Sequence, residues 1–169
     1  MEFLRNKGLI TSFLLLYFVV GMFLAHAVIS VGVKGGDWIE YSVVTTGKPE
    51  EGHDVIWARM EILGVQGTQI SVNVTTKASN GTFESGVMIL NPAKGNVGVW
   101  FIIPANLTVG ESFYDASKNQ NVTIEGSKQR SIAGATRTVT HATTPERIKS
   151  WDKSTGVFVE SIASSGIKG

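Results

Sequence analysis

Carboxylates and histidines are the side chains of this chain best suited to chemistry, because its 169 residues include no cysteine. The stretch "PEEGHD" brings Glu50, Glu51, His53 and Asp54 together, so its oxygen atoms could bind a divalent cation weakly. A calcium loop needs about six oxygen ligands in a fixed arrangement, and the spacing of an EF-hand is absent. The pattern therefore favours a solvated acidic turn over a metal site.

Three further carboxylates, Glu111, Asp115 and Glu125, could supply the acid and base of a glycosidase, but their spacing is not diagnostic. His141 lies in "TRTVTHAT", where a strand surface is a simpler role for it than catalysis. The nucleophile elbow G-x-S-x-G, a phosphate-binding glycine loop and the zinc pair H-E-x-x-H do not occur. We therefore expect no catalytic residue, no metal and no cofactor.

The composition excludes other classes of protein. A chain without cysteine has no disulfide, no cysteine nucleophile and no lipid-modified N-terminal cysteine. Removing Glu2, Arg5 and Lys7 from the 14 acidic and 15 basic residues leaves 13 of each after residue 27. A neutral chain without a basic run has no electrostatic reason to bind phosphates, so we expect no nucleic-acid partner.

The elements that must position any site begin after a hydrophobic segment, residues 1–33, which contains no charged residue between Gly8 and Val33. Two interpretations stay open. "AHA" at 25–27 fits the cleavage site of a signal peptide, and the whole run is long enough for a membrane-spanning anchor. The basic residues before the run predict a cytoplasmic N-terminus. Residues 34–169 would then form an extracytoplasmic domain, anchored to the cell membrane or secreted after cleavage near Ala27.

Beyond Gly35 apolar and polar residues alternate, which is typical of strands with one buried face. Asn80-Gly81 predicts a hairpin turn between two such runs, and "DKSTG" at 152–156 predicts a longer hairpin loop. The sequence thus predicts an all-β domain, an antiparallel sheet forming a curved half-barrel or a sandwich, preceded by one N-terminal hydrophobic helix. The residues expected to face inward are Ile39, Tyr41, Val43, Ile56, Met60, Ile62, Ile70, Val72, Val74, Val122 and Ile124.

Two stretches, "GVMIL" at 86–90 and "VGVWFII" at 97–103, are apolar without alternation. Such runs suit strands covered on both faces, or the wall of a groove that holds an apolar ligand. Both alternatives stay open, and the candidate groove residues are Val97, Val99, Trp100, Phe101, Ile102 and Ile103.

Four sequons, at Asn73, Asn80, Asn106 and Asn121, predict N-glycosylation of an exported surface. Asn73 and Asn121 fall on the polar faces of predicted strands, and the other two fall in a predicted turn and a predicted loop. All four could therefore carry a glycan facing solvent.

The tryptophans allow two interpretations. Trp38 and Trp57 lie opposite the main apolar set, which places them in a second packed layer or on an exposed platform. Packing is favoured, because buried aromatic rings contribute much of the stability of β-sandwich cores.

Four segments together resemble a known group of proteins: "GVKGGDWIEYSV", "FIIPANLTVGESFY", "AGATRTV" and "WDKSTGVFVE". They are similar to exported archaeal proteins of uncharacterised function, in which a signal or anchor helix precedes one β-rich domain. The "WDKSTG" hairpin also resembles lipoprotein-carrier half-barrels of the LolA and LppX type, where a curved sheet encloses an apolar ligand. The chain lacks a predicted helix to cover such a cavity.

We therefore expect an exported, membrane-anchored, non-catalytic cell-surface domain with a binding or structural role. Its expected partners are the membrane, through the N-terminal helix if this is uncleaved, and a surface protein or an apolar ligand. The alternatives are a carrier of a lipid-like ligand and a hydrolytic enzyme.

Overall fold

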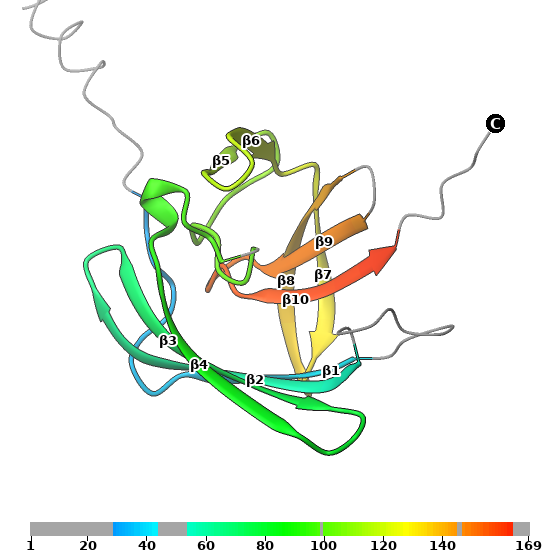
Figure 1. Cartoon of the computed structure of the whole chain (residues 1–169). Helices are drawn as coiled ribbons and strands as arrows, with labels where there is room; N and C mark the ends of the chain where they lie inside the picture. Colours follow the sequence, from blue (N-terminus) through cyan, green and yellow to red (C-terminus); the bar gives the residue numbers. More distant parts are fainter. Residues whose placement is uncertain (1–28, 44–53, 99, 145–146, 164–169) are drawn as a thin grey trace, which may run out of the picture.

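The structure is a computed structural model that describes residues 29–43, 54–98, 100–144 and 147–163. These residues form an all-β domain of antiparallel strands with one short 3₁₀ turn, η1 (Pro92–Lys94), which confirms the predicted all-β class with antiparallel sheets. Figure 1 shows three layers, with strands β1–β4 at one side, β7–β10 in the middle and the β5–β6 hairpin at the other side.

The first sheet is a four-stranded meander of neighbouring strands in the order β1-β2-β3-β4. Its strands are β1 (Trp38–Ser42), β2 (Val55–Gln66), β3 (Gln69–Ala78) and β4 (Phe83–Leu90). Asn80-Gly81 turns β3 into β4 as predicted, because Gly81 adopts a φ of 90° and the Asn80 side chain accepts a hydrogen bond from the Thr82 amide.

The second sheet is another meander, in the order β10-β9-β8-β7. Its strands are β7 (Gly126–Ile132), β8 (Ala135–Thr143), β9 (Arg147–Asp152) and β10 (Phe158–Ala163). The small hairpin pairs β5 (Ser112–Asp115) with β6 (Gln120–Thr123). The predicted "DKSTG" loop joins β9 to β10, with the Asp152 carboxylate accepting hydrogen bonds from Ser154 and Thr155 inside the turn.

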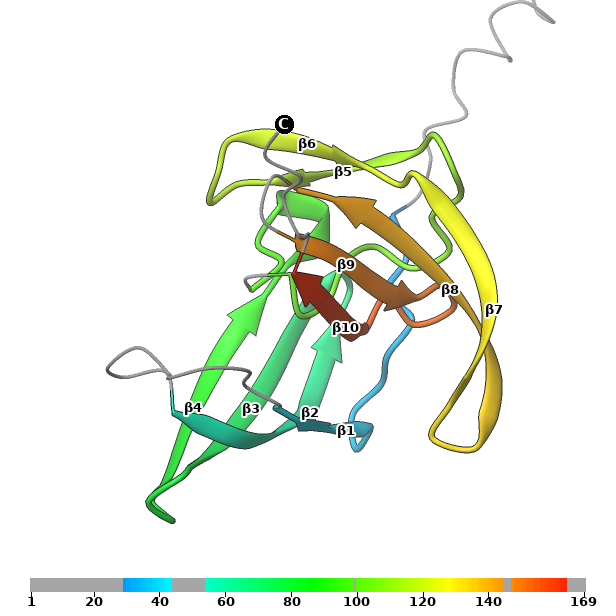
Figure 2. The same cartoon turned by 90° about the vertical axis from the view of Figure 1, so that its right-hand side faces the viewer.

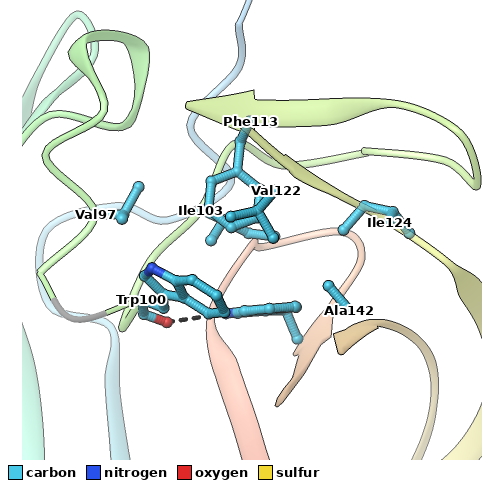
Figure 3. Packing of buried hydrophobic residues seen from close by; sticks show 8 residues of the cluster. Val97, Trp100, Ile103, Phe113, Val122, Ile124 and Ala142 are labelled. Atoms are coloured by element: carbon cyan, nitrogen blue, oxygen red, sulfur yellow. Dashed lines mark hydrogen bonds between the residues drawn. The ribbon is translucent and has the colours of Figure 1, made fainter. Parts of the chain in front are cut away.

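Two hydrophobic cores lie on opposite sides of the second sheet. The core between the sheets contains Met60, Ile62, Ile70 and Val72, and Ile102 packs against them from a loop. The core between the second sheet and the β5–β6 hairpin includes Phe113 and Ala142, as Figure 3 shows. It also contains the ring of Trp151, which is fully buried. Its members are Val97, Trp100, Ile103, Phe113, Val122, Ile124, Ala142 and Trp151.

Most of the residues predicted to face inward do so, but two of them are exposed. Val43 is 42% exposed and Ile56 is 44% exposed. A register shift between Val55 and Trp57 makes Ile56 an extra residue in the β2–β3 pairing, and a β-bulge of this kind breaks the simple alternation of faces. Val43 is exposed together with Ile56, because the Val43 amide donates a hydrogen bond to the Ile56 carbonyl and holds the two residues side by side.

The two continuous apolar runs also differ from the expectation of strands covered on both faces. Residues 86–90 belong to β4, the edge strand of the first sheet, where Val87 and Met88 on opposite faces are 64% and 36% exposed. The described residues of the run 97–103 do not form a strand, and lie in the chain segment between η1 and β5. Continuity of apolar residues therefore marks an edge strand in one case and a buried loop in the other.

Residues 30–33 belong to the folded domain, although they were predicted to lie in the hydrophobic segment. Ser30 pairs with Ala105 in an isolated bridge, and Val33 is buried in the core between the sheets. The rest of the predicted signal or anchor segment, residues 1–28, lies outside the described residues. Within the ranges that the structure describes, no helix is long and apolar enough to cross a membrane.

Candidate binding groove

A groove of about 660 Å³ opens where the edge strands of the two sheets, β1 and β10, approach the β7–β8 hairpin. Figure 2 views the molecule from this side, with β1 below β10 and the hairpin beside them. This volume lies within the range of about 300–1,000 Å³ found for ligand pockets. The lining residues are Val33, Gly36, Asp37, Trp38, Ile39, Glu40, Met60, Ile62, Ile132, Ala133, Arg137, Asp152, Thr155, Val157 and Val159.

The floor of the groove is apolar and comes from both sheets. Met60 and Ile62 are buried side chains of β2, and Val157 and Val159 line the groove from the start of β10. Val33 joins them from the segment that precedes β1. A bound group that fills this space would exchange water for an apolar surface, which is favourable at about 25 cal/mol per Å².

Tyr41 and Phe158 link β1 to β10 beyond the groove residues. The Tyr41 hydroxyl donates a hydrogen bond of 3.0 Å to the Phe158 carbonyl, and the two ring centroids lie 5.7 Å apart. Burial raises the pKa of Tyr41 well above its usual value. This neutral contact fixes the spacing of the two edge strands next to the groove.

An ion pair lies at the second-sheet side of the groove. Arg137 of β8 donates to the Asp152 carboxylate at 3.0 Å, and Asp152 is 5% exposed. Burial acts to raise the Asp152 pKa, but hydrogen bonds from Ser154, Arg137 and Thr155 outweigh it and hold the pKa below its usual value. Asp152 is therefore an ionised structural group that fixes both Arg137 and the β9–β10 turn.

The first-sheet side of the groove is acidic. Glu40 pairs with Arg59 at 3.4 Å, whereas Asp37 accepts a hydrogen bond from the Lys34 amide and has no ion pair within the described part of the chain. The lining contains three carboxylates, of Asp37, Glu40 and Asp152, against one cation, Arg137. Asp152 and Glu40 are neutralised by their partners, so among the described residues Asp37 gives the groove one uncompensated negative charge.

The main chain of β1 is open along the groove. The Ile62 amide donates a hydrogen bond to the Asp37 carbonyl, and the Val43 amide donates one to the Ile56 carbonyl, so the peptide groups of these odd-numbered residues point towards β2. Peptide groups of an antiparallel strand alternate in direction, so those of Trp38, Glu40 and Ser42 point away from β2. Among the described residues no main-chain hydrogen bond satisfies them.

The residues predicted to form a groove in 97–103 fill the two cores instead. Val97, Trp100 and Ile103 pack under the β5–β6 hairpin, as Figure 3 shows, and Ile102 and Phe101 pack against the first sheet. None of these described residues lines the groove, and Val99 lies outside the described residues. Their positions match the core alternative of the sequence analysis.

Trp100 is held in a left-handed conformation, with a φ of 74°. Its indole nitrogen donates to the Asp115 carboxylate at 2.5 Å, and its carbonyl accepts from the Trp151 indole at 2.9 Å (dashed in Figure 3). Burial acts to raise the Asp115 pKa, but hydrogen bonds from Ser117, Trp100 and Lys118 lower it overall. These bonds offset the strain of about 1–2 kcal/mol at Trp100, so Asp115 has a structural role.

The other residues considered for chemistry have local partners. Glu111 accepts hydrogen bonds from Thr108, and Glu125 accepts one from the Thr143 hydroxyl. His141 is half-buried and lies against Gly126, where a Cβ atom would stand 2.1 Å from the imidazole. Glu50, Glu51 and His53 lie outside the described residues, and the described ranges hold no cluster of three metal-ligating side chains.

The four sequons lie at the surface in different settings. Asn80, Asn106 and Asn121 are exposed, in a hairpin turn, a loop and β6 respectively. Asn73 is half-buried in the central strand β3, where its side-chain oxygen accepts a hydrogen bond from the Ser85 hydroxyl. The predicted polar faces of β3 and β6 are therefore correct.

Trp38 and Trp57 lie on the outer face of the first sheet, which corrects the preference for a second packed layer. Trp38 is 58% exposed, and the Arg59 guanidinium lies 4.6 Å from its ring centroid. Trp57 packs edge-on against Phe83 of β4, over which Lys77 lies. Cations therefore lie over the rings of Trp38 and Phe83. The groove is a better-formed candidate binding site than this outer face.

The groove could not be predicted from the sequence, because its lining comes from four chain segments, 33–40, 60–62, 132–137 and 152–159. Comparison of the chain with protein-family models, with curated proteins and with solved structures gives no match. The fold and the groove thus define the class: an all-β domain of antiparallel sheets with an apolar groove between two sheet edges.

Proposed function

We propose that this chain is an exported, non-catalytic binding domain that takes up its partner in the groove between β1 and β10. The observation that carries the proposal is the groove itself, with buried Met60 and Ile62 in its floor and charged groups at its sides. A concave apolar site with few polar groups is the usual form of a binding site.

The roles of the carboxylates support a non-catalytic assignment. Asp152 fixes a turn and Asp115 fixes Trp100, and both carboxyl groups have lowered pKa values. A general acid or base needs a pKa near the working pH, which lowered values do not provide. Turnover by the pure protein that disappears on a single substitution would contradict this assignment.

We further propose that the domain acts at the cell surface, held by an uncleaved N-terminal hydrophobic helix and glycosylated at one or more sequons. The uncharged residues 8–28 and the exposed positions of Asn80, Asn106 and Asn121 support this location. It also agrees with the resemblance to exported archaeal β-domain proteins.

A carrier of an apolar, lipid-like ligand is the second candidate function. The apolar floor favours it, because the side chains of Val33, Val157 and Val159, which line the groove, are hydrocarbon. A carrier needs the same groove as a protein-binding domain, and the two candidates therefore differ in the chemistry of the occupant.

Native mass spectrometry of the full chain, isolated from its natural source, tests the proposal. Val159→Trp should fill the groove, because Val159 lines it and is half-buried, and it should lower the bound fraction at least about tenfold. Val109→Trp, at an exposed loop position outside the lining, is the matched control. A wild-type protein that carries no ligand, or equal ligand in both variants, would contradict the proposal.

A further inference from the structure

We infer that the open edge of β1 accepts an extended polypeptide strand, which adds to the first sheet while its alternate side chains enter the groove. The inference rests on the proposed function, since it uses the same groove, and it names the class of partner as a peptide in β-conformation. Binding by strand addition draws affinity from main-chain hydrogen bonds and selectivity from side-chain pockets.

The main chain of β1 supplies the first argument. Trp38, Glu40 and Ser42 each present one N–H and one C=O away from β2, and the described residues offer these groups no main-chain partner. A hydrocarbon ligand cannot satisfy peptide groups, whereas an added strand pairs with them at the usual sheet spacing. The open edge therefore favours a polypeptide over a lipid.

The edge of β1 has little protection against pairing with another strand. Edge strands are often protected by proline, by charged side chains or by a bulge. Strand β1 contains no proline and no lysine, pairs with β2 in unbroken register, and has one charged residue, Glu40, which is paired with Arg59. The free edge of β7 differs, because it carries Lys128 and Arg130. The edge strand β4 is also open, but the groove lining contains none of its residues.

The side chains of the groove supply the third argument. Successive side chains of a strand point to opposite faces, so every second residue of an added strand would face the floor made by Met60, Val157 and Val159. We expect Val, Ile or Leu at these positions, because the floor offers no polar partner for them.

Charge complementarity supplies the fourth argument. Asp37 stands at the start of β1 without an ion pair in the described part of the chain, and Arg137 is neutralised by Asp152. An anionic lipid head group would meet repulsion here, whereas a lysine or arginine of a peptide would find a carboxylate. We therefore expect a partner strand with one basic residue near Asp37.

A substitution at Glu40 isolates the contribution of the main chain. The Glu40 N–H points away from β2, so Glu40→Pro removes a donor of the open edge without removing a hydrogen bond of the sheet. Glu40→Ala is the matched control, because it removes the same side chain and the same ion pair with Arg59 but keeps the N–H. Equal melting temperatures of the two variants would show that both are folded alike.

The probe is a library of octapeptides with Val, Ile or Leu at alternate positions and random residues between them, screened against the full chain. We expect retained peptides with a basic residue, whose affinity is at least about tenfold lower for Glu40→Pro than for Glu40→Ala. N-methylation of the peptide at the residues that face β1 should give the same loss against the wild-type protein. Asp37→Asn should remove the preference for a basic residue.

Three results would overturn the inference. One is a library without a retained peptide, and another is peptide affinity that Glu40→Pro and N-methylation leave unchanged. The third is a co-purified lipid that Val159→Trp displaces and Glu40→Pro does not. That result would leave the groove as the binding site, and would thus separate the failure of the strand inference from failure of the proposed function.

Discussion

Tyr41 of β1 donates its hydroxyl hydrogen bond to the main-chain carbonyl of Phe158 of β10, across the space between the two sheets. The two residues are 117 positions apart in the sequence. This contact ties the two edge strands together beside the groove, so it serves both the stability of the domain and the shape of the site.

Tyr41→Phe should lower the free energy of unfolding by about 1 kcal/mol at neutral pH, because it removes one hydrogen bond and keeps the ring contact with Phe158. The effect of alkali should change as well. Burial raises the pKa of Tyr41 above 10.0, its usual value, so the unfolded chain ionises first as the pH rises. The stabilisation is complete below about pH 10 and is lost above it.

Urea unfolding at about pH 8 and about pH 11 measures both effects. The difference in stability between wild type and Tyr41→Phe should shrink or reverse at the higher pH. Tyr114→Phe is a control, since Tyr114 is exposed and bonds only the nearby Asn119 side chain. A constant difference between wild type and Tyr41→Phe at both pH values would contradict the assignment of Tyr41 as the group responsible.

Asp152→Asn should destabilise the domain by about 2–4 kcal/mol, because the carboxylate accepts bonds from Arg137, Ser154 and Thr155 while almost fully buried. Since the folded pKa lies below the usual 3.8, the stabilisation is present above that value and is lost as the pH falls through the folded pKa. Acid unfolding followed by circular dichroism should therefore be less steep for Asp152→Asn. The same change in slope with Glu84→Gln, an exposed position on β4, would argue against Asp152.

Two glycines separate the cost of a positive φ from the cost of a steric clash. Gly81 and Gly156 have φ values of 90° and 72°, but an added Cβ meets no atom within 4 Å at Gly81 and lies 2.1 Å from the Ile103 carbonyl oxygen at Gly156. We expect Gly81→Ala to cost about 1 kcal/mol and Gly156→Ala about 2–4 kcal/mol. Chemical denaturation of both variants measures the two losses of unfolding free energy. Equal losses would mean that the β9–β10 turn moves to relieve the clash at little cost.

Asn80 is the sequon whose use is simplest to test, because it lies in an exposed hairpin turn. In a host with an N-glycosylation system, Asn80→Gln and Thr82→Ala should each lower the intact mass by one glycan. Ser79→Ala, which leaves the sequon intact, should not. A wild-type mass equal to that of the bare polypeptide would refute glycosylation at all four sequons.

The local parts of the fold could be predicted from the sequence. Alternation in β3 placed Ile70 and Val72 inside and Asn73 outside, and Asn80-Gly81 marked its hairpin, because pleat and turn geometry depend on neighbouring residues. Alternation failed at Ile56, since a β-bulge inserts one residue and no sequence period announces it.

The tertiary features could not be predicted in the same way. An apolar run does not reveal whether a second layer will cover it. Residues 86–89 lie exposed on an edge strand, whereas Trp100 and Ile103 lie in a buried loop. The groove combines Asp37, Met60, Arg137 and Val159 from distant segments. The glycine-rich stretch "GVKGGD" at 32–37, which has no strand-like alternation of apolar and polar residues, contributes Val33, Gly36 and Asp37 to its lining.

The position of residues 30–33 has a mechanical consequence. Gly32 lies so close to Ser154 and Thr155 that a Cβ would stand 2.2 Å from the Ser154 carbonyl oxygen, and Ser30 pairs with Ala105. A pulling force applied at the amino end would first load these contacts in shear. Because the next core residue, Val33, is part of the groove wall, tension that passes beyond these contacts would act directly on the groove.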